Sequence, residues 1–250
     1  MVLVLYSCLY GEKEPLNPDC FGGFRGDRTV LVSDRPRDVP EGVELLIDTA
    51  PGPDPARASR RAKLMPHRFF PEAEWSICLD NKSRLLRDPS EIVAALKAQS
   101  DADFFAYPHF ARSCVYQEIR AVLENGLDDP KIVRERRRFY RKEGMPRDTG
   151  LIEGHFIVRR HTPGVAAFGE EWFDHVTRFS RRDQLSFPYL AWKRGFRYDL
   201  ITALPRKDTV RLTVFDRANR RPDFPRQAVA YQWLRARWHK VRRLVLGRAR

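Results

Sequence analysis

Apolar residues recur along the chain in two patterns, short continuous runs and helical stripes. The runs fall at residues 2–10, 29–33, 43–47, 75–79, 104–107 and 152–160. Continuous apolar runs of this length are typical of strands in a sheet that is covered on both faces. Between them, apolar residues at three- and four-residue spacing predict helices, for example over 115–125 and 170–179. Strands that alternate with helices indicate an α/β fold with a central mixed, mostly parallel sheet flanked by helices.

The C-terminal part of the chain differs from the rest in composition. We expect a final strand over 198–204, after which residues 205–225 are rich in proline and arginine and predict a linker. Residues 226–247 place apolar side chains on one broad stripe beside basic ones, which predicts a basic amphipathic helix. The sequence therefore predicts one α/β domain over 1–205, followed by a linker and a C-terminal helix over 206–250.

The chain is strongly basic. Its 250 residues include 46 Lys or Arg against 33 Asp or Glu, which gives a net charge of +13. This balance favours an anionic partner such as nucleic acid, an anionic membrane surface or a phosphorylated substrate. Eight basic residues and no acidic ones fall in 226–250, so the charge does not mark the main domain as a nucleic-acid binder. The C-terminal helix fits either a membrane interface or a site on the domain's own core.

The N-terminal residues, the apolar runs and the cysteines predict where in the cell the protein is found. The first residues lack the basic region and the cleavage site of a secretory signal peptide, and no apolar run reaches the length of a membrane span. The four cysteines lack the paired spacing of a zinc site and fit reduced thiols. We therefore expect a cytoplasmic protein, peripheral at the inner face of the membrane if its C-terminal helix docks there.

The first candidate site follows the apolar run at 75–79, where Asp80-Asn81-Lys82 ends the predicted strand. In parallel sheets ligands bind beyond the carboxyl ends of the strands. Asp80 could bind a divalent metal such as Mg²⁺ or Mn²⁺ together with a distant ligand, or Lys82 could neutralise a phosphate directly without metal. The structural alternative is an aspartate that only starts a turn.

Two further groups of residues carry charge toward the same region. Arg60 and Lys63 belong to a predicted basic helix that precedes Asp80, and they could surround a diphosphate or form a solvated helix face. His161 follows the strand at 152–160 and could complete a metal shell with its neutral imidazole. His155 lies on that strand, so one of the two histidines could be structural.

Arg182, Asp183 and Gln184 stand where a loop meets a predicted helix. The carboxylate of Asp183 could cap this helix, or it could face the site as a base or as an acceptor of hydroxyl groups. Arg182 could hold a phosphate or pair with Asp183.

Polar residues also lie around the predicted helix at 115–125. His109, Arg112 and Glu118 could bind hydroxyl groups of an acceptor or belong to ordinary surface polarity. The basic run over 134–142 is typical of a solvated helix face, with an anionic acceptor as the functional alternative.

Three segments carry a family resemblance. They are KLMPHRFFPEAEWSICLDNKSRLLRDP at 63–89, YPHFARSCVYQEI at 107–119 and EGHFIVRRHTPGVAAFGEEWFDHVTRFSRRDQLSFPYL at 153–190. Together they resemble the glycosyltransferase-like domain of the plant TOD and MUCI proteins and its bacterial relatives. The most specific element is RDQLSF at 182–187, and the resemblance covers residues 1 to about 205.

The resemblance implies a GT-A-like nucleotide-diphosphosugar transferase fold. The implied activity is transfer of a sugar from a nucleotide-diphosphate donor to a glycan or glycolipid acceptor, in the synthesis of surface polysaccharide. Within the family pattern, Asp80 matches a strand-end aspartate, and the catalytic positions fall on Arg182, Asp183 and Gln184. His161, Arg112 and Glu118 match further segments, and the incomplete Asp-x-Asp motif leaves the metal open.

Two other functions compete with this hypothesis. A membrane-associated hydrolase of a glycolipid or sphingolipid would suit the basic tail, but the chain has neither a Gly-x-Ser-x-Gly nor a His-Glu-x-x-His motif. A basic nucleic-acid-binding module would suit the net charge, but the sequence carries no recognisable nucleic-acid motif.

Overall fold

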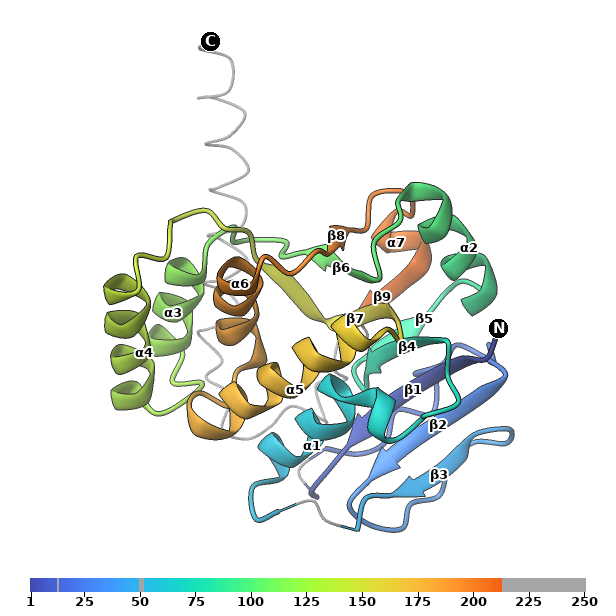
Figure 1. The fold of residues 1–250 in the computed structure, drawn as a ribbon. Helices are drawn as coiled ribbons and strands as arrows, with labels where there is room; N and C mark the ends of the chain where they lie inside the picture. Colours follow the sequence, from blue (N-terminus) through green and yellow to red (C-terminus); the bar gives the residue numbers. More distant parts are fainter. Residues whose placement is uncertain (13, 50–51, 213–250) are drawn as a thin grey trace.

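The computed structural model describes residues 1–12, 14–49 and 52–212, and its fold is drawn in Figure 1. Its centre is a seven-stranded sheet in the order β3-β2-β1-β4-β7-β6-β8. These strands are β1 (Leu3–Leu9), β2 (Arg28–Ser33), β3 (Glu44–Ile47), β4 (Trp75–Asp80), β6 (Phe104–Pro108), β7 (Ile152–Arg160) and β8 (Asp199–Leu200). Only β7 runs antiparallel to its neighbours in this sheet. The predicted mixed, mostly parallel sheet is therefore confirmed.

Helices follow the strands along the chain. They are α1 (Pro55–Leu64), the 3₁₀ turn η1 (Pro66–Arg68), α2 (Pro89–Gln99), α3 (Val115–Glu124), α4 (Pro130–Lys142), α5 (Pro163–Arg178), α6 (Asp183–Arg194) and α7 (Arg206–Thr209). No helix among the described residues is long and apolar enough to cross a membrane.

The core has two layers because successive side chains of a strand point to opposite faces of the sheet. On β1, Val4 and Tyr6 pack in the layer that contains apolar residues of α1, α3, α5 and α6. Leu3 and Leu5 pack in the other layer, with α2 and the loop that carries Phe21. Figure 1 shows α3, α4 and α6 gathered at the side of the molecule away from β3. Both faces of the sheet are covered, as the continuous apolar runs predict.

The C-terminal described residues depart from the expected linker. Residues 206–212 form α7 and β9 (Val210–Leu212), and β9 pairs with β5 (Ser83–Leu85) in a small second sheet. Val210 and Leu85 are buried in the core layer of α2, so the packed body continues beyond residue 205. The final strand expected over 198–204 is only Asp199–Leu200. The helix predicted over 226–247 lies outside the described residues.

The strand directions decide where a site can form. Because β1, β2, β3, β4 and β6 all run the same way, the residues that follow them lie at one edge of the sheet. β7 runs the other way and therefore begins at this edge. We call it the carboxyl edge; polar residues at its strand ends are Tyr10, Asp34, Asp48, Asp80, His109 and Glu153. Open α/β sheets bind their ligands at such an edge.

Candidate active site

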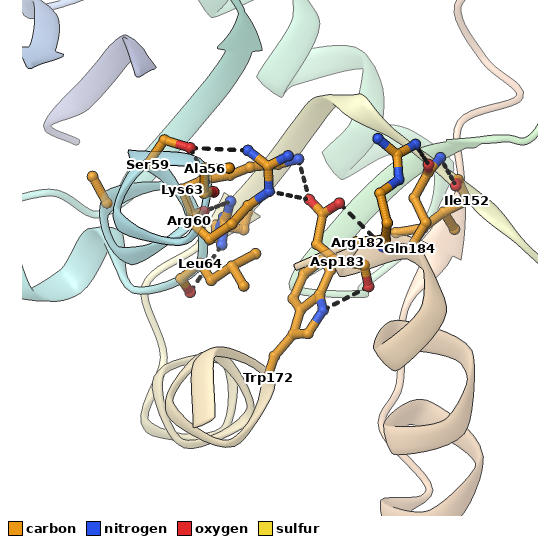
Figure 2. Close-up of polar contacts among 12 residues, drawn as sticks. Ala56, Ser59, Arg60, Lys63, Leu64, Ile152, Trp172, Arg182, Asp183 and Gln184 are labelled. Atoms are coloured by element: carbon orange, nitrogen blue, oxygen red, sulfur yellow. Dashed lines mark hydrogen bonds and ion pairs between the residues drawn. The ribbon is translucent and has the colours of Figure 1, made fainter. Parts of the chain in front are cut away.

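A buried carboxylate surrounded by cations forms the centre of the site. Asp183 is the first residue of α6, and its Oδ2 contacts Lys63 Nζ and lies 3.5 Å from Arg60 Nε, as Figure 2 shows. Asp183 and Lys63 are 4% and 8% exposed. Trp172 Nε1 of α5 donates a hydrogen bond of 3.0 Å to the Asp183 carbonyl and so fixes the start of α6. The structure thus brings Asp183, Lys63 and Arg60 into contact.

The two cations reach Asp183 because of how α1 is built. Asp54 caps α1 by accepting a hydrogen bond of 2.9 Å from Ala56 N–H, and Pro55 occupies the first helical position. Residues three apart on a helix share a face, so Arg60 and Lys63 point to the same side of α1. Both belong to its last two turns; α1 lies beside α5 (Figure 1), and Lys63 reaches the first residue of α6.

A glycine makes room for this ion pair. A Cβ at Gly154 of β7 would lie 2.9 Å from Lys63 Nζ and 3.3 Å from Asp183 Oδ2. Any other residue at this position would push Lys63 or Asp183 away. Gly154 therefore fixes the contact between α1, α6 and the start of β7.

The charges around Asp183 hold it ionised. Burial alone would raise the pKa of Asp183, but the charges of Lys63, Arg60 and Arg182 outweigh it and lower that pKa well below its ordinary value. A carboxylate with so low a pKa is a weak proton acceptor. The arrangement therefore suits hydrogen-bond acceptance from a sugar hydroxyl better than general-base catalysis. Capping of α6 is a minor role, since Arg182 is the N-cap residue and Asp183 Oδ1 accepts only the Gln184 N–H, at 3.1 Å.

Asp80 belongs to the same charge cluster. It is exposed at the end of β4, and although its crowded surroundings would raise its pKa, Lys82, Lys63 and Arg60 lower it. Lys63 and Arg60 thus act on both Asp80 and Asp183. The structure therefore brings together the five residues that were predicted to bind a diphosphate and its sugar: Arg60, Lys63, Asp80, Lys82 and Asp183.

His161 does not belong to this cluster, and its prediction as a metal ligand with Asp80 is wrong. Arg160 pairs with Trp75 at the start of β4, so His161 lies at the opposite end of the strand from Asp80. His161 N–H donates to the Glu74 carbonyl, just before β4, so the separation from Asp80 along the strand is about 20 Å at about 3.3 Å per residue. His161 Nε2 lies 2.9 Å from Ser76 Oγ, which gives this histidine a structural partner.

His155 is the histidine that stands near Asp80. Phe156 pairs with Leu79, so His155 lies across from Asp80, one step further along the ladder. Its Nδ1 is 3.2 Å from Glu153 Oε2, whereas its Nε2 is buried without a hydrogen-bond partner among the described residues. Burial lowers the pKa of His155 and favours the neutral imidazole that a metal requires. A carboxylate and an orphaned imidazole nitrogen suit Mn²⁺ or Mg²⁺ only if the donor's phosphates supply further ligands, because the described residues contain no cluster of three His, Cys, Asp or Glu.

The three residues predicted for the acceptor lie together after β6. Arg112 contacts Glu118, which is 1% exposed, and the backbone N–H groups of Ala111 and Arg112 donate to His109 Nδ1 at 3.1 and 3.2 Å. Burial first, then the charge of Arg112, lowers the pKa of His109 to about 3, so the ring is neutral. These contacts shape the loop over 109–114 from within. The charge of Arg182 lowers the pKa of both His109 and Asp183, so it acts on both groups. Gln184 Nε2 donates to the Ile152 carbonyl at 3.1 Å.

The sequence analysis did not predict some residues of the carboxyl edge as site residues. Asp48 follows β3, is 4% exposed and accepts hydrogen bonds from Tyr10 Oη (2.9 Å) and Arg61 (2.6 Å). Glu153 begins the edge on β7, and the exposed ring of Phe110 stacks on His109. A polar residue directly after an apolar run was a usable signal for Asp48. No sequence signal separates Phe110 from a core aromatic.

The fold and the site together define a glycosyltransferase-like α/β domain. The sequence profile of the family described as TOD1/MUCI70, glycosyltransferase-like domain, matches residues 43–222. The chain belongs to this family, which confirms the resemblance found in its sequence.

Two curated relatives from Arabidopsis thaliana are similar to this chain. A probable hexosyltransferase, MUCI70, is 30% identical over 182 residues, which cover 67% of this chain and 31% of the relative. An alkaline ceramidase, TOD1, is 23% identical over 192 residues, which cover 68% of this chain and 42% of the relative. The chain thus spans less than half the length of either relative. Among solved structures, the apo form of mouse xyloside xylosyltransferase 1 is similar with a TM-score of 0.47 and 10% identity, covering 79% of this chain and 84% of that one.

Proposed function

We propose that this protein transfers a sugar, a hexose by analogy with the probable hexosyltransferase, from a nucleotide diphosphate to a glycan or glycolipid acceptor. The observation that carries the proposal is the cluster of Asp183, Lys63 and Arg60 beside Asp80 at the carboxyl edge. Cations near two carboxylates fit a ligand that combines an anionic diphosphate with a hydroxyl-rich sugar. Membership of a glycosyltransferase-like family supports it.

The nucleotide lies over β1, β2 and β3 in this proposal. Tyr10, Asp48 and Arg61 form one hydrogen-bonded group there, and Asp34 accepts the Gly11 N–H at 3.0 Å beside it. Such a group offers an aromatic ring and carboxylates to a base and a ribose. The diphosphate then extends toward Asp80, Lys82 and Lys63, and the sugar toward Asp183.

During transfer the bond between the anomeric carbon and the diphosphate oxygen breaks, a bond forms to the acceptor oxygen, and the proton of the acceptor hydroxyl passes to the departing diphosphate or to water. Negative charge grows on the departing diphosphate, where Lys63, Arg60 and Lys82 stabilise it. Asp183 holds sugar hydroxyl groups through its ionised oxygens. A divalent metal, where the donor brings one, would sit at Asp80 and His155 and neutralise phosphate charge.

The acceptor lies on the other half of the edge, over β6 and the start of β7. The Phe110 ring is 58% exposed and stacks on His109 with centroids 5.0 Å apart. Its backbone N–H donates to Glu153 Oε1 at 3.1 Å, and Glu153 is held in turn by Arg206. A fixed, exposed aromatic ring suits the apolar face of a sugar. Surface polysaccharide synthesis and a cytoplasmic location stay predictions from the sequence.

The hydrolase alternative has support from the similarity to an alkaline ceramidase. Ser76 and His161 are in contact, as a nucleophile and its base would be. Ser76 is 0% exposed, however, so no substrate reaches its hydroxyl. Because Ser76 is buried, the charge cluster around Asp183 is the better candidate site, and its cations fit sugar transfer from a diphosphate better than hydrolysis of a lipid.

Thermal unfolding with a panel of nucleotide diphosphates and nucleotide sugars, each with and without Mn²⁺, tests the proposal. A ligand present at a hundred times its dissociation constant adds about 2.7 kcal/mol of stability, which raises the melting temperature measurably. We expect one nucleotide to stabilise the protein and Asp80→Asn to abolish the shift. Asp174→Asn, on the exposed side of α5, is the matched control and should keep it.

Turnover of the stabilising nucleotide sugar in the presence of glycan acceptors completes the test, with ceramide hydrolysis assayed in parallel. Absence of a shift throughout the panel refutes the donor site. Ceramide cleavage that is abolished in Asp80→Asn would move the assignment to the hydrolase.

A further inference from the structure

The outer face of α4 carries a stripe of cations. Lys131, Arg134, Arg138, Arg141 and Lys142 recur at spacings of three, four or one residue and are all exposed. Residues at three- and four-residue spacing share one face of a helix. The single acidic residue of α4 is Glu135, so this face is almost entirely positive.

None of these five cations forms an ion pair within the described part of the chain, whereas Arg28 and Arg194 on other elements pair with Glu44 and Glu171. Other exposed cations, such as Lys97 and Lys207, also have no ion pair among the described residues, but they stand on separate elements. What distinguishes α4 is that five cations gather on one helix with only Glu135 among them, which leaves a net repulsion along the helix. A face of this kind gains stability when an anionic partner covers it.

The inner face holds α4 firmly against the domain. Asp129 caps the helix by accepting from Lys131 N–H at 2.7 Å. The Arg136 guanidinium points inward and stacks on Phe179, 3.2 Å from the ring centroid, and Tyr140 Oη donates to the Leu185 carbonyl at 2.7 Å. Figure 1 shows α4 at the outside of the molecule, with α3 and α6 toward the sheet. The stripe is therefore presented on a rigid helix.

The shape of this face favours a flat partner. The stripe lies on the outer side of a helix, and the cavity of about 450 Å³ in the described structure is lined by Asp103, Phe168, Phe196 and their neighbours, without any α4 residue. Phe139, 38% exposed, flanks the cations. Cations beside an exposed aromatic ring suit the headgroup region of a bilayer.

We propose that the outer face of α4 docks this protein on a membrane that contains anionic phospholipid. Each cation near such a surface strengthens binding by roughly fivefold. This surface does not include residues 213–250, which lie outside the described structure.

Docking through α4 would also bring the acceptor side of the site close to the membrane. Tyr116 Oη of α3 donates to the Met145 carbonyl just after α4, at 3.0 Å. The C-terminal end of α4 therefore lies beside the start of α3, which directly follows the loop over 109–114. A glycolipid acceptor in the same bilayer could then approach Phe110; this clause rests on the proposed function, whereas the docking does not.

Cosedimentation of the full-length protein with vesicles tests the docking without any sugar donor. We expect binding to phosphatidylcholine vesicles that contain phosphatidylglycerol and none to pure phosphatidylcholine. The variant Arg134→Glu/Arg138→Glu/Arg141→Glu should bind at least tenfold more weakly. The control Arg84→Glu/Lys97→Glu/Lys207→Glu has the same net charge, with its changes at exposed positions on other elements, and should bind far better than the α4 variant. Unchanged melting temperatures show that both variants are folded.

A second variant separates the contribution of α4 from that of the basic C-terminal segment. Lys240→Glu/Arg242→Glu/Arg243→Glu changes only residues outside the described structure, and we expect the α4 face to keep part of the binding in it. Wild-type binding by the α4 variant would overturn the proposal. So would α4-dependent retention on an acidic polysaccharide by a protein that does not bind the anionic vesicles.

Discussion

Lys63 and Asp183 lie 120 residues apart in the sequence and form a buried ion pair. The pair joins the end of α1 to the start of α6, and Gly154 of β7 leaves the space for it. The charges of Lys63 and Arg60 lower the pKa of both Asp183 and Asp80. One contact thus holds together three elements of the site, and its loss should be visible in stability as well as in binding.

Removal of one partner should destabilise the protein. Asp183→Ala leaves the Lys63 ammonium buried without its anion, and breaking a buried pair in this way costs about 3–5 kcal/mol. Urea unfolding would measure the loss. Arg194→Ala on the same helix removes an exposed pair with Glu171 and should cost at most about 1 kcal/mol.

The double variant Lys63→Met/Asp183→Ala completes that experiment. It removes both charges, so most of the lost stability should return. If Asp183→Ala unfolds at the same urea concentration as Arg194→Ala, the pair does not hold the two helices together.

Ionisation of Asp183 should change how the free energy of unfolding depends on pH. Its pKa is lowered in the folded state, so its ionised form stabilises the fold at every pH above the unfolded value of about 3.9. As pH falls below about 4 toward the folded pKa, this contribution is lost. The difference in unfolding free energy between wild type and Asp183→Asn should therefore be constant near neutral pH and shrink below about pH 4. A difference that instead shrank between pH 6 and 8 would assign the effect to another group.

Metal dependence should distinguish two histidines on one strand. His155 stands across from Asp80 with a buried, unpaired Nε2, whereas His161 lies at the far end of β4 against Ser76. If Mn²⁺ strengthens donor binding, we expect His155→Ala to abolish the Mn²⁺-dependent shift in melting temperature and His161→Ala to keep it. The reverse result would restore His161 as the ligand. A donor shift that is the same with and without Mn²⁺ in the wild type would leave Lys82 as the phosphate partner.

Sequence patterns located the strands and their carboxyl edge because apolar runs and polar strand ends are local signals. Asp80 and Asp183 were predicted on that basis and through the RDQLSF segment, and they share their cations in the structure. His161 was misplaced because β7 runs antiparallel to β4, and strand direction is a property of pairing between distant segments. β9 was missed for a similar reason, since its partner β5 lies more than a hundred residues earlier. The burial of Glu118 and the exposure of Phe110 likewise follow from tertiary packing.

Acceptor binding should depend on Phe110. Phe110→Ala removes an exposed ring that Glu153 holds in place through the backbone, and loss of such a stacking surface should raise KM for the acceptor by about tenfold, or 1.4 kcal/mol. Binding of the donor nucleotide should not change, because β1 to β3 lie on the other half of the edge. Initial rates at varied acceptor concentration measure the effect. Leu212→Ala, which removes an exposed apolar side chain on β9, is the control; an equal rise in KM for both variants would contradict the assignment.

A buried arginine gives the last prediction. Arg136 is 3% exposed, and none of its three guanidinium nitrogens has a hydrogen-bond partner among the described residues. Burial lowers its pKa, and the rings of Phe179, Phe139 and Tyr140 are its contacts. Contact between a desolvated cation and aromatic rings stabilises the folded state by about 2 kcal/mol or more. Burial of a charge without hydrogen bonds, however, costs several kcal/mol. Arg136→Met keeps the length and the apolar contacts, so we expect its unfolding free energy to equal or exceed that of the wild type. Urea unfolding decides the matter: a loss of more than about 2 kcal/mol would show that the ring contacts outweigh the burial of the charge.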